Sequence, residues 1–337
     1  MSKKIRILSI DGGGIRGIIP GKILMYVEKR IQEVSGNPQA KIADYFDFFA
    51  GTSTGGILTG IYLCPDENDP TKPRFSAEQA LELYLRRGPA IFNASAWKKF
   101  TSLKGLKNEI YSGEPLERYL KAYFREVQLS ELIKPCIITA YEIEKRYAHF
   151  FSRDDARKNS AYDFYLRDVA RSSSAAPIYF QAANIKSISG DSFTFADGGL
   201  FANNPSMCAL TEIYKTIPEA QLKDVVMLSL GTGIKKKPYT FEEAKFWGAI
   251  GWVKPIMHIM MSAINDTVDH ELIQTFKNGG FEKQYLRLSP FLGEESSGDL
   301  DDASPQHIDT LLKSAEQCIE FNQAEIDSIV NQIVNPL

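Results

Sequence analysis

The sequence predicts an α/β protein with a mostly parallel central sheet flanked by helices. This prediction rests on two segments in which a short apolar strand ends in a glycine-rich turn and a helix pattern follows. The strands are predicted at residues 5–10 and 46–50, and the turns at residues 11–17 and 51–56. Strand, glycine turn and helix, repeated in this order, are typical of a parallel sheet whose crossovers are helices.

Length and composition limit what such a protein can be. A chain of 337 residues, 44% of them hydrophobic, can bury a large core, and we expect a single domain over residues 1–337. The net charge of -3 argues against a nucleic-acid-binding protein, because such proteins usually carry an excess of basic residues. The four cysteines are widely scattered, which excludes a disulfide scaffold and most zinc sites.

The first half of the chain alternates between strands and helices. Apolar residues at helical spacing predict a helix over residues 23–31, and Gly36-Asn37-Pro38 ends it. A second helix begins near Ile57. Residues 64–112 are interpreted as an excursion over one sheet edge, as readily a lid as a plain surface connection, in which Gly88-Pro89 breaks a short helix.

The rest of the chain continues the pattern up to a helical C-terminal part. The predicted elements are a helix at 116–123, a strand at 136–141, a helix ending near Pro177, a strand at 193–196, a helix after Asn204 and a strand at 225–230. Residues 240–337 are predicted to be a helical C-terminal subregion. Within it, the apolar segment at 246–261 is expected to be a buried helix near the core rather than a membrane-facing one.

The turn at residues 11–17, with the sequence DGGGIRG, is a candidate anion site. Gly12, Gly13 and Gly14 let the backbone approach a ligand and point N–H groups inward, and the start of the following helix adds a partial positive charge. Such a turn stabilises either a bound phosphate or a transient oxyanion. Gly12, Gly14 and Gly17 also match the spacing of a dinucleotide site, but the next strand does not end in the acidic residue that binds the ribose, so this match is weak.

The second turn matches Gly-x-Ser-x-Gly, with Ser53 between Gly51 and Gly55. Its position between an apolar strand and an apolar helix is typical of a nucleophile elbow, in which the serine lies on a sharp, strained turn. The flanking glycines avoid collisions with neighbouring backbone, and the helix start favours developing negative charge. A serine turn that only caps a helix is the alternative.

The serine requires a base, because its hydroxyl is a weak nucleophile at neutral pH. The four histidines lie at positions 149, 258, 270 and 307, and none is in a turn after an apolar strand. Asp197, in the turn Asp197-Gly198-Gly199, is a better candidate if it lies within hydrogen-bond distance of the serine and is partly desolvated. The same Asp-Gly pair is also a hairpin signal, and the residues alone leave the two interpretations nearly equal.

Taken together, the three turns resemble the motif set of the patatin-like phospholipases, and they occur in the same order along the chain. Further segments that resemble plant patatins are ANNP at 202–205, LGTG at 230–233, YLRL at 285–288 and DDAS at 301–304, so the resemblance covers nearly the whole chain. It implies a three-layer fold and a serine–aspartate dyad without histidine. By this resemblance Ser53 is the nucleophile, Asp197 is the base, and the N–H groups of Gly12, Gly13 and Gly14 form the oxyanion hole.

The resemblance also implies a reaction and its partners. We expect a phospholipase A or related lipid acyl hydrolase that releases a fatty acid from membrane glycerophospholipids or galactolipids, with Arg16 near a headgroup phosphate and with no metal or organic cofactor. Some bacterial relatives are activated by a small nucleotide, but no residue of this sequence identifies such a site. The alternatives are a non-catalytic lipid-binding or storage protein and a nucleotide-binding protein that uses the turn from Gly12 to Gly17.

Location and membrane contact are inferred from the apolar segments. No apolar run approaches the roughly 18 residues of a membrane span, so we expect a cytoplasmic protein that contacts membranes peripherally. Besides the segment at 246–261, the basic and aromatic residues Trp97, Lys98, Lys99, Phe100 and Lys104 are a candidate membrane-binding loop.

Overall fold

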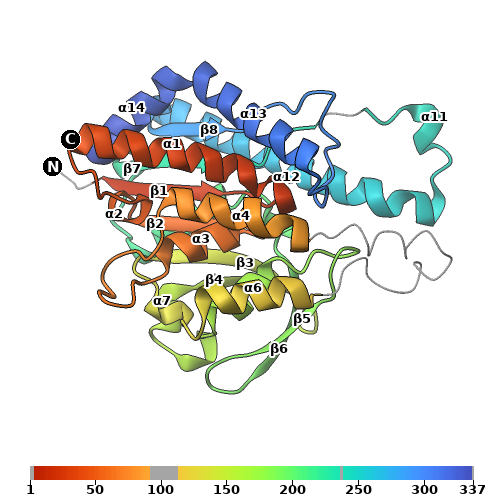
Figure 1. Cartoon of the computed structure of the whole chain (residues 1–337), viewed down its shortest axis with the longest axis horizontal. Coiled ribbons are helices and arrows are strands. Elements are labelled where there is room, and N and C mark those ends of the chain that lie inside the picture. Colours follow the sequence, from red (N-terminus) through yellow and green to blue (C-terminus); the bar gives the residue numbers. More distant parts are fainter. Residues whose placement is uncertain (1–3, 92–112, 236–237, 336–337) are drawn as a thin grey trace.

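The structure is a computed structural model that describes residues 4–91, 113–235 and 238–335, without the side chains of residues 249, 250, 253 and 254 (Figure 1). The strands are β1 (Ile5–Ile10), β2 (Phe48–Thr52), β3 (Cys136–Glu142), β4 (Tyr147–Ser152), β5 (Ala183–Lys186), β6 (Ser192–Asp197), β7 (Val225–Leu230) and β8 (Tyr285–Leu288). The α-helices are α1 (Ile18–Ser35), α2 (Ile42–Tyr45), α3 (Thr54–Leu63), α4 (Ala77–Ile91), α6 (Glu114–Phe124), α7 (Arg153–Ala156), α8 (Leu166–Ser173), α9 (Gly199–Ala202), α10 (Ser206–Thr216), α11 (Phe241–Ala244), α12 (Gly248–Gly279), α13 (Pro305–Phe321) and α14 (Gln323–Val334). The 3-10 helices are η1 (Gly14–Gly17), η3 (Leu129–Glu131), η4 (Ser160–Tyr162), η5 (Leu222–Asp224) and η6 (Glu282–Gln284).

In the described part of the chain, eight strands form one sheet whose larger part is parallel. The path through the sheet is β5-β6-β3-β2-β1-β7-β8, with β4 also paired to β3. Parallel pairing joins β3 to β2, β2 to β1, β1 to β7 and β7 to β8, whereas β4, β5 and β6 enter by antiparallel pairing. The predicted α/β class with a mostly parallel sheet is therefore confirmed.

Helices cover both faces of the sheet because the central strands are apolar on both sides. In β1, Leu8 belongs to the core formed with α1, α3, α4, α13 and α14, while its neighbour Ile7 belongs to the core formed with α10 and the C-terminal half of α12. The same alternation separates Phe49 from Phe48 in β2. Successive side chains of a strand point to opposite faces, so a strand that is apolar throughout has to be covered twice. The result is the arrangement of helix, sheet and helix in Figure 1.

Strand β3 brings together two chain segments that are far apart in the sequence. One edge of β3 pairs with β4 over residues 137–142. The other edge pairs first with the end of β2, where Thr52 lies opposite Thr139, and then with the end of β6, where Asp197 lies opposite Ala140. Because β2 is parallel and β6 antiparallel to β3, the carboxyl ends of β2 and β6 meet head to head on one edge. The turns that follow these two strands are therefore neighbours.

Several helix boundaries follow local signals in the sequence. The helix predicted over residues 23–31 is longer at both ends, and it stops before Gly36, which adopts a left-handed φ of 66°. The helix predicted after Asn204 begins at Ser206, whose N–H donates to Asn204 Oδ1 at 3.1 Å. At these two boundaries a small polar residue before the helix start and a glycine after the helix end mark the limits correctly.

The predicted break at Gly88-Pro89 is wrong, because α4 continues through Pro89 to Ile91. Gly88 packs directly on the side chain of Ile15, and a Cβ built on Gly88 would lie 2.4 Å from Ile15 Cδ1. Tertiary packing therefore holds this part of α4 helical despite the proline.

The C-terminal part from residue 240 is mainly helical, as predicted, but it also supplies a strand that the sequence analysis missed. Strand β8 pairs in parallel with β7 and forms one end of the sheet path. It has only four residues, of which Arg287 alone is charged, and so short a segment shows no periodicity that would distinguish a strand from a loop. The sheet is thus completed by residues late in the chain.

The expectation that residues 246–261 form a buried helix is also wrong. Phe246 is 79% exposed, and Trp252 and Ile256 are each 43% exposed, although the more distant Leu272 and Phe276 on the same helix are fully buried. Apolar composition predicted burial, but only the second half of α12 lies on the sheet. The first half of α12 projects beyond the body of the molecule (Figure 1).

Two further predictions concern a membrane-spanning helix and a membrane-binding loop. No helix within the described ranges combines the length and the apolar character that a membrane span requires. The candidate membrane-binding loop around Trp97 and Lys98 lies outside the described residues, as does the end of the excursion predicted over residues 64–112.

A buried ion pair joins the end of the first strand to the last strand. Asp11 follows β1 and is fully buried, and Arg287 of β8 binds it through both guanidinium nitrogens, with Nη1 to Oδ1 at 2.8 Å. Arg287 Nη1 also donates to Ser229 Oγ of β7 at 2.8 Å. The Asp11 N–H donates to Leu230 O at 2.9 Å. These bonds fix the backbone from which the glycine turn starts.

Arg287→Met should lower the free energy of unfolding by about 3–5 kcal/mol, because it leaves the Asp11 carboxylate buried without its partner. Urea denaturation followed by circular dichroism at neutral pH measures this change. Arg86→Met is the control, since it removes only an exposed ion pair with Glu82 on α4 and should change the same free energy by less than about 1 kcal/mol. Equal and small losses in both variants would show that the buried pair does not hold the strands together.

Candidate active site

Ser53 occupies a strained turn between β2 and α3. Its φ of 54° and ψ of -119° lie in a region of backbone angles that residues other than glycine rarely adopt. The turn is possible because of the two glycines around it: a Cβ on Gly51 would lie 2.3 Å from Gly55 O, and a Cβ on Gly55 would lie 2.1 Å from Ile10 O. The Ser53 N–H donates to Ser173 Oγ at 2.8 Å, which holds the turn from the side of α8. This is the geometry expected of an elbow that presents a serine hydroxyl at a strand end.

The structure brings Ser53 and Asp197 into direct contact. Ser53 Oγ donates to Asp197 Oδ2 at 2.7 Å, and the Gly199 N–H donates to the other carboxylate oxygen at 2.7 Å. The two residues are 144 positions apart in the sequence. The head-to-head meeting of β2 and β6 on β3 accounts for this contact, because Ser53 directly follows β2 and Asp197 is the last residue of β6.

Burial sets the proton affinity of the Asp197 carboxyl. The side chain is almost fully buried, and this desolvation raises its pKa from the ordinary 3.8 to about 6, while the hydrogen bonds from Ser53 and Gly199 act in the opposite direction. A carboxylate with this pKa is ionised at neutral pH and still has an appreciable affinity for a proton. It can therefore accept a proton from a hydroxyl at hydrogen-bond distance.

The glycine turn presents only part of the donor set predicted for it. The Gly12 N–H donates to Asn203 O at 3.0 Å, so the predicted oxyanion role of this N–H is wrong. The N–H groups of Gly13 and Gly14 have no acceptor among the described residues, and both glycines line the pocket beside Ser53. Neither glycine tolerates a side chain, because a Cβ would lie 2.2 Å from Thr232 Oγ1 at Gly13 and 2.2 Å from Leu300 O at Gly14. Two free donors therefore remain at the pocket wall.

Arg16 does not lie where a headgroup contact was expected. It belongs to η1, which forms the second half of the glycine turn, and it is not one of the residues that line the pocket. Burial lowers the pKa of its guanidinium to about 10, although the negative charges of Asp299 and Asp11 act in the opposite direction, so the group stays charged at neutral pH. Its Nε is buried and has no hydrogen-bond partner among the described residues.

The histidines lie in other surroundings. His149 on β4 is buried in an aromatic cluster, with ring centroids 4.5 Å from Phe151 and 5.0 Å from Phe195, and burial lowers its pKa to about 4. His149 is thus a packing residue of this cluster. In the part of the chain that the structure describes, no hydrogen bond joins a histidine to Ser53.

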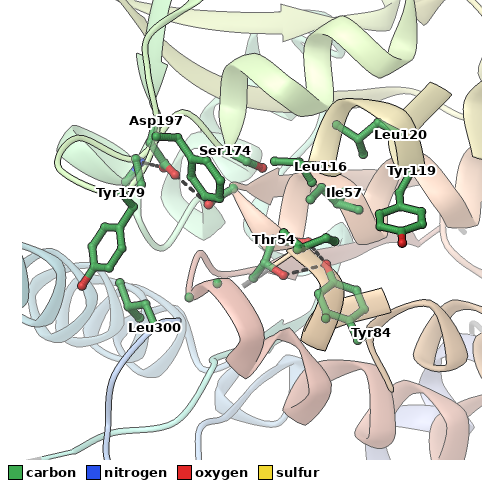
Figure 2. Close-up of a pocket in the computed structure, with 18 of the residues that line it drawn as sticks. Thr54, Ile57, Tyr84, Leu116, Tyr119, Leu120, Ser174, Tyr179, Asp197 and Leu300 are labelled. Atoms are coloured by element: carbon green, nitrogen blue, oxygen red, sulfur yellow. Dashed lines mark hydrogen bonds between the residues drawn. The ribbon is translucent and has the colours of Figure 1, made fainter. Parts of the chain in front are cut away.

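An apolar pocket adjoins Ser53 and Asp197 (Figure 2). Its walls come mainly from α4 and α6, with Leu83 and Tyr84 on the first helix and Leu116, Tyr119 and Leu120 on the second. Figure 2 shows the side chains from α6 on one side of the pocket and Asp197 on the other. The helix of the excursion predicted over residues 64–112 is therefore a wall of the pocket and not a plain surface connection. A wall of this composition accommodates a hydrocarbon chain.

No role was predicted from the sequence for three residues near the site, although one of them, Asn203, lies in the ANNP segment at 202–205. They are Ser173, which accepts from the Ser53 N–H, Tyr84, whose hydroxyl exchanges hydrogen bonds with Thr54 at 2.6 and 2.9 Å, and Asn203. Asn203 lines the pocket, donates to Asn265 Oδ1 at 3.0 Å and keeps its own Oδ1 buried without a partner among the described residues. Each reaches the site through tertiary packing, which a sequence pattern does not encode.

The described residues hold no group of three or more histidine, cysteine, aspartate or glutamate side chains placed to bind a metal ion.

Comparison with known proteins gives consistent matches. A family model described as Patatin-like phospholipase matches residues 8–210. Patatin-like protein 2 from Oryza sativa subsp. indica is 33% identical over 351 residues, which span 96% of this chain and 86% of that protein. Patatin group D-2 from Solanum tuberosum is 31% identical over 337 residues, which span 95% of this chain and 85% of that protein. Among solved structures, VipD from Legionella pneumophila has a TM-score of 0.41 and 13% identity over 95% of this chain and 67% of that chain, a likeness too weak to support a conclusion.

Asp197→Asn should stabilise the protein at neutral pH. The unfolded chain ionises this carboxyl near pH 3.8 and the folded protein at about 6, so stability is lost as the pH rises from 3.8 through 6 and is constant above that. The difference corresponds to about 3 kcal/mol at about 1.4 kcal/mol for each tenfold change in the ionisation equilibrium. Because asparagine does not ionise, we expect the variant to gain about 1–3 kcal/mol at pH 7.5, after allowing for a weaker hydrogen bond with Ser53.

Urea denaturation at pH 7.5 and at pH 4.5 measures this difference, and the gain should be smaller at the lower pH. Asp309→Asn, which alters an exposed carboxyl paired with Lys313 on α13, is the control and should change stability by less than about 1 kcal/mol at either pH. A loss of stability in Asp197→Asn at pH 7.5 would mean that the buried carboxylate is not destabilising.

Proposed function

The chain belongs to the patatin-like phospholipase family, and from this premise we propose that it hydrolyses acyl esters of lipids with Ser53 as nucleophile and Asp197 as base. Family membership supports lipid acyl hydrolase activity in general. The assignment of residues to steps is our own inference from the geometry.

The observation that carries this proposal is the hydrogen bond of 2.7 Å from Ser53 Oγ to Asp197 Oδ2 beside an apolar pocket. A general base has to lie within hydrogen-bond distance of the proton that it removes. The hydroxyl is also held on a strained elbow at the start of α3, where the positive end of the helix dipole favours negative charge on the oxygen. Both groups needed for nucleophilic attack are thus positioned before a substrate binds.

In the acylation step, Asp197 Oδ2 takes the proton from Ser53 Oγ as this oxygen forms a bond to the ester carbonyl carbon. The electron pair of the carbonyl moves to its oxygen, and the N–H groups of Gly13 and Gly14 stabilise the resulting oxyanion. Each such donor contributes about 3 kcal/mol to the stabilisation of a transition state of this kind. The intermediate then expels the alcohol oxygen, which receives the proton from Asp197, and an acyl-serine remains.

In the deacylation step, Asp197 takes a proton from water, and the water oxygen attacks the acyl carbonyl. Collapse of this second intermediate breaks the bond to Ser53 Oγ, which regains its proton from Asp197, and a fatty acid is released. The unpartnered Oδ1 of Asn203 at the pocket wall can accept the other hydrogen of this water. Both steps balance without a metal or an organic cofactor.

The substrate class follows from the pocket and the family. An apolar pocket between α4 and α6 accommodates the acyl chain, and the ester then lies near Ser53 at its wall. We propose membrane glycerophospholipids or galactolipids as the lipids cleaved. The dinucleotide alternative is less well supported, because the glycine turn faces this apolar pocket, and Gly17 packs closely on Thr54, where a Cβ would lie 2.2 Å from Oγ1.

Ser53→Ala should abolish release of fatty acid while the protein stays folded, because the variant has no nucleophile. Mass spectrometry of products from a mixed phospholipid and galactolipid extract measures the loss and identifies the lipids cleaved. Ser174→Ala is the matched control: Ser174 also lines the pocket, but its Oγ has no hydrogen-bond partner among the described residues, so most activity should remain.

A fluorophosphonate probe tests the nucleophile independently of the natural substrate. It should label the wild type and the Ser174→Ala variant but not Ser53→Ala. Retained hydrolysis in Ser53→Ala would refute the assignment, and a wild type that is neither labelled nor active would favour a non-catalytic lipid-binding or storage protein.

The rate should depend on pH through Asp197. Because the base acts in its ionised form and its pKa is about 6, kcat/KM on a dissolved p-nitrophenyl ester should rise with pH, with a midpoint near 6, and level off above it. Asp197→Asn should lower the rate by a factor on the order of 10²–10⁴ and remove this rise. A midpoint near 7 that persists in Asp197→Asn would point to a histidine base instead.

A further inference from the structure

The two faces of the first half of α12 differ in what they contact. Met257 and Met261 line the pocket that contains Ser53. At 100° per residue, Trp252, Ile256 and Ile259 lie within about 60° of one another on the opposite side of the helix. These three side chains are 43%, 43% and 39% exposed. One helix therefore forms a pocket wall on one face and presents an apolar stripe to solvent on the other.

The segment before this helix continues the exposed apolar surface. Phe241, the first residue of α11, and Phe246, two residues after its end, are 76% and 79% exposed. Edge-to-face contacts join Tyr239 to Trp247 at 4.9 Å and Trp247 to Trp252 at 4.8 Å between ring centroids, so this segment is packed against the start of α12. We name residues 238–261 the arm.

The arm itself contains two lysines and two glutamates and has no net charge, but three consecutive lysines precede it at residues 235–237. Residues 235–261 contain five lysines and two glutamates, a net charge of +3, whereas the whole chain has a net charge of -3. Lys245 Nζ lies over the rings of Phe246 and Phe241, at 4.8 and 5.6 Å from their centroids. Exposed aromatic side chains with lysines between them suit the boundary between the hydrocarbon and the anionic headgroups of a bilayer.

We propose that the arm is the surface by which this protein docks on anionic lipid bilayers. This inference rests on the proposed function, because a lipid acyl hydrolase has to take its substrate from a bilayer and the pocket shares α12 with the arm. Phe241, Phe246 and the stripe on α12 enter the interface, and Lys245 stays at headgroup level. The wall formed by Met257 and Met261 is then held next to the lipid surface.

A second copy of the chain is a less suitable partner for the same surface. Two copies that face one another through residues 235–261 bring together two segments of net charge +3, which repel each other, whereas an anionic bilayer attracts both. The lipid surface therefore accounts for the apolar residues and for the charge together.

The test compares binding to vesicles with hydrolysis of a dissolved ester. The probe is a vesicle of equal parts diether phosphatidylcholine and diether phosphatidylglycerol, whose ether bonds are not hydrolysed, and binding is measured by co-sedimentation. The double variant Phe241→Ser/Phe246→Ser should bind these vesicles about tenfold or more weakly. Its turnover of a dissolved p-nitrophenyl ester should equal that of the wild type, because neither residue lines the pocket.

The chain offers a matched control in Phe321 at the end of α13, which is 90% exposed and lies outside the arm. Phe321→Ser should bind the vesicles as the wild type does. A second arm variant, Ile256→Ser/Ile259→Ser, should lose binding as the phenylalanine variant does. Wild-type binding should also weaken on vesicles of diether phosphatidylcholine alone and at high salt.

Two results would overturn the proposal. One is vesicle binding in both arm variants that equals the wild type. The other is a wild type that sediments as a dimer and becomes monomeric in the arm variants, since the arm would then be an interface between copies. Because the ether lipids measure binding without turnover, a wild type that binds vesicles but hydrolyses no ester refutes the proposed function and not the docking surface.

Discussion

The candidate site depends on the way in which two strands share one edge of a third. Strand β3 is long enough to pair with β2 over its first half and with β6 over its second half, while β4 occupies its other edge. The antiparallel direction of β6 places its last residue next to the residue that follows β2. Backbone pairing along β3 therefore sets the distance between Ser53 Oγ and Asp197 Oδ2, and a slip of one residue would point Asp197 to the opposite face of the sheet.

The same arrangement stores unfavourable energy at the site. Ser53 has a backbone conformation that is rare for its residue type. Asp197 has no cationic partner among the residues that the structure describes, and burial raises its pKa. The surrounding structure offsets this energy through close packing of Gly51 and Gly55 and through the buried pair of Asp11 with Arg287. Strain and desolvation of this kind are typical of functional sites, where the reacting groups are positioned at the expense of stability.

Local chemistry explains what the sequence could predict. Glycine-rich turns after apolar strands identified the end of β1 and came within two residues of the end of β2, and Asp197 was identified as one of two kinds of candidate base. The choice between Asp197 and a histidine depends on strand register, which no local pattern encodes, and the engagement of the Gly12 N–H depends on Asn203, a residue of a distant turn. The exposure of the arm was missed for a related reason. A pattern of apolar residues does not show whether the apolar face packs on the rest of the protein or is exposed for contact with a partner such as a lipid bilayer.

The long separations along the chain between paired residues have a consequence for synthesis. Ser53 meets its partner 144 positions later, and Asp11 meets Arg287 at a separation of 276. A growing chain that has emerged only as far as β4 contains the serine elbow and the whole glycine turn but neither the carboxylate nor the arginine that completes them. The nascent polypeptide therefore carries no assembled dyad until the greater part of it has left the ribosome.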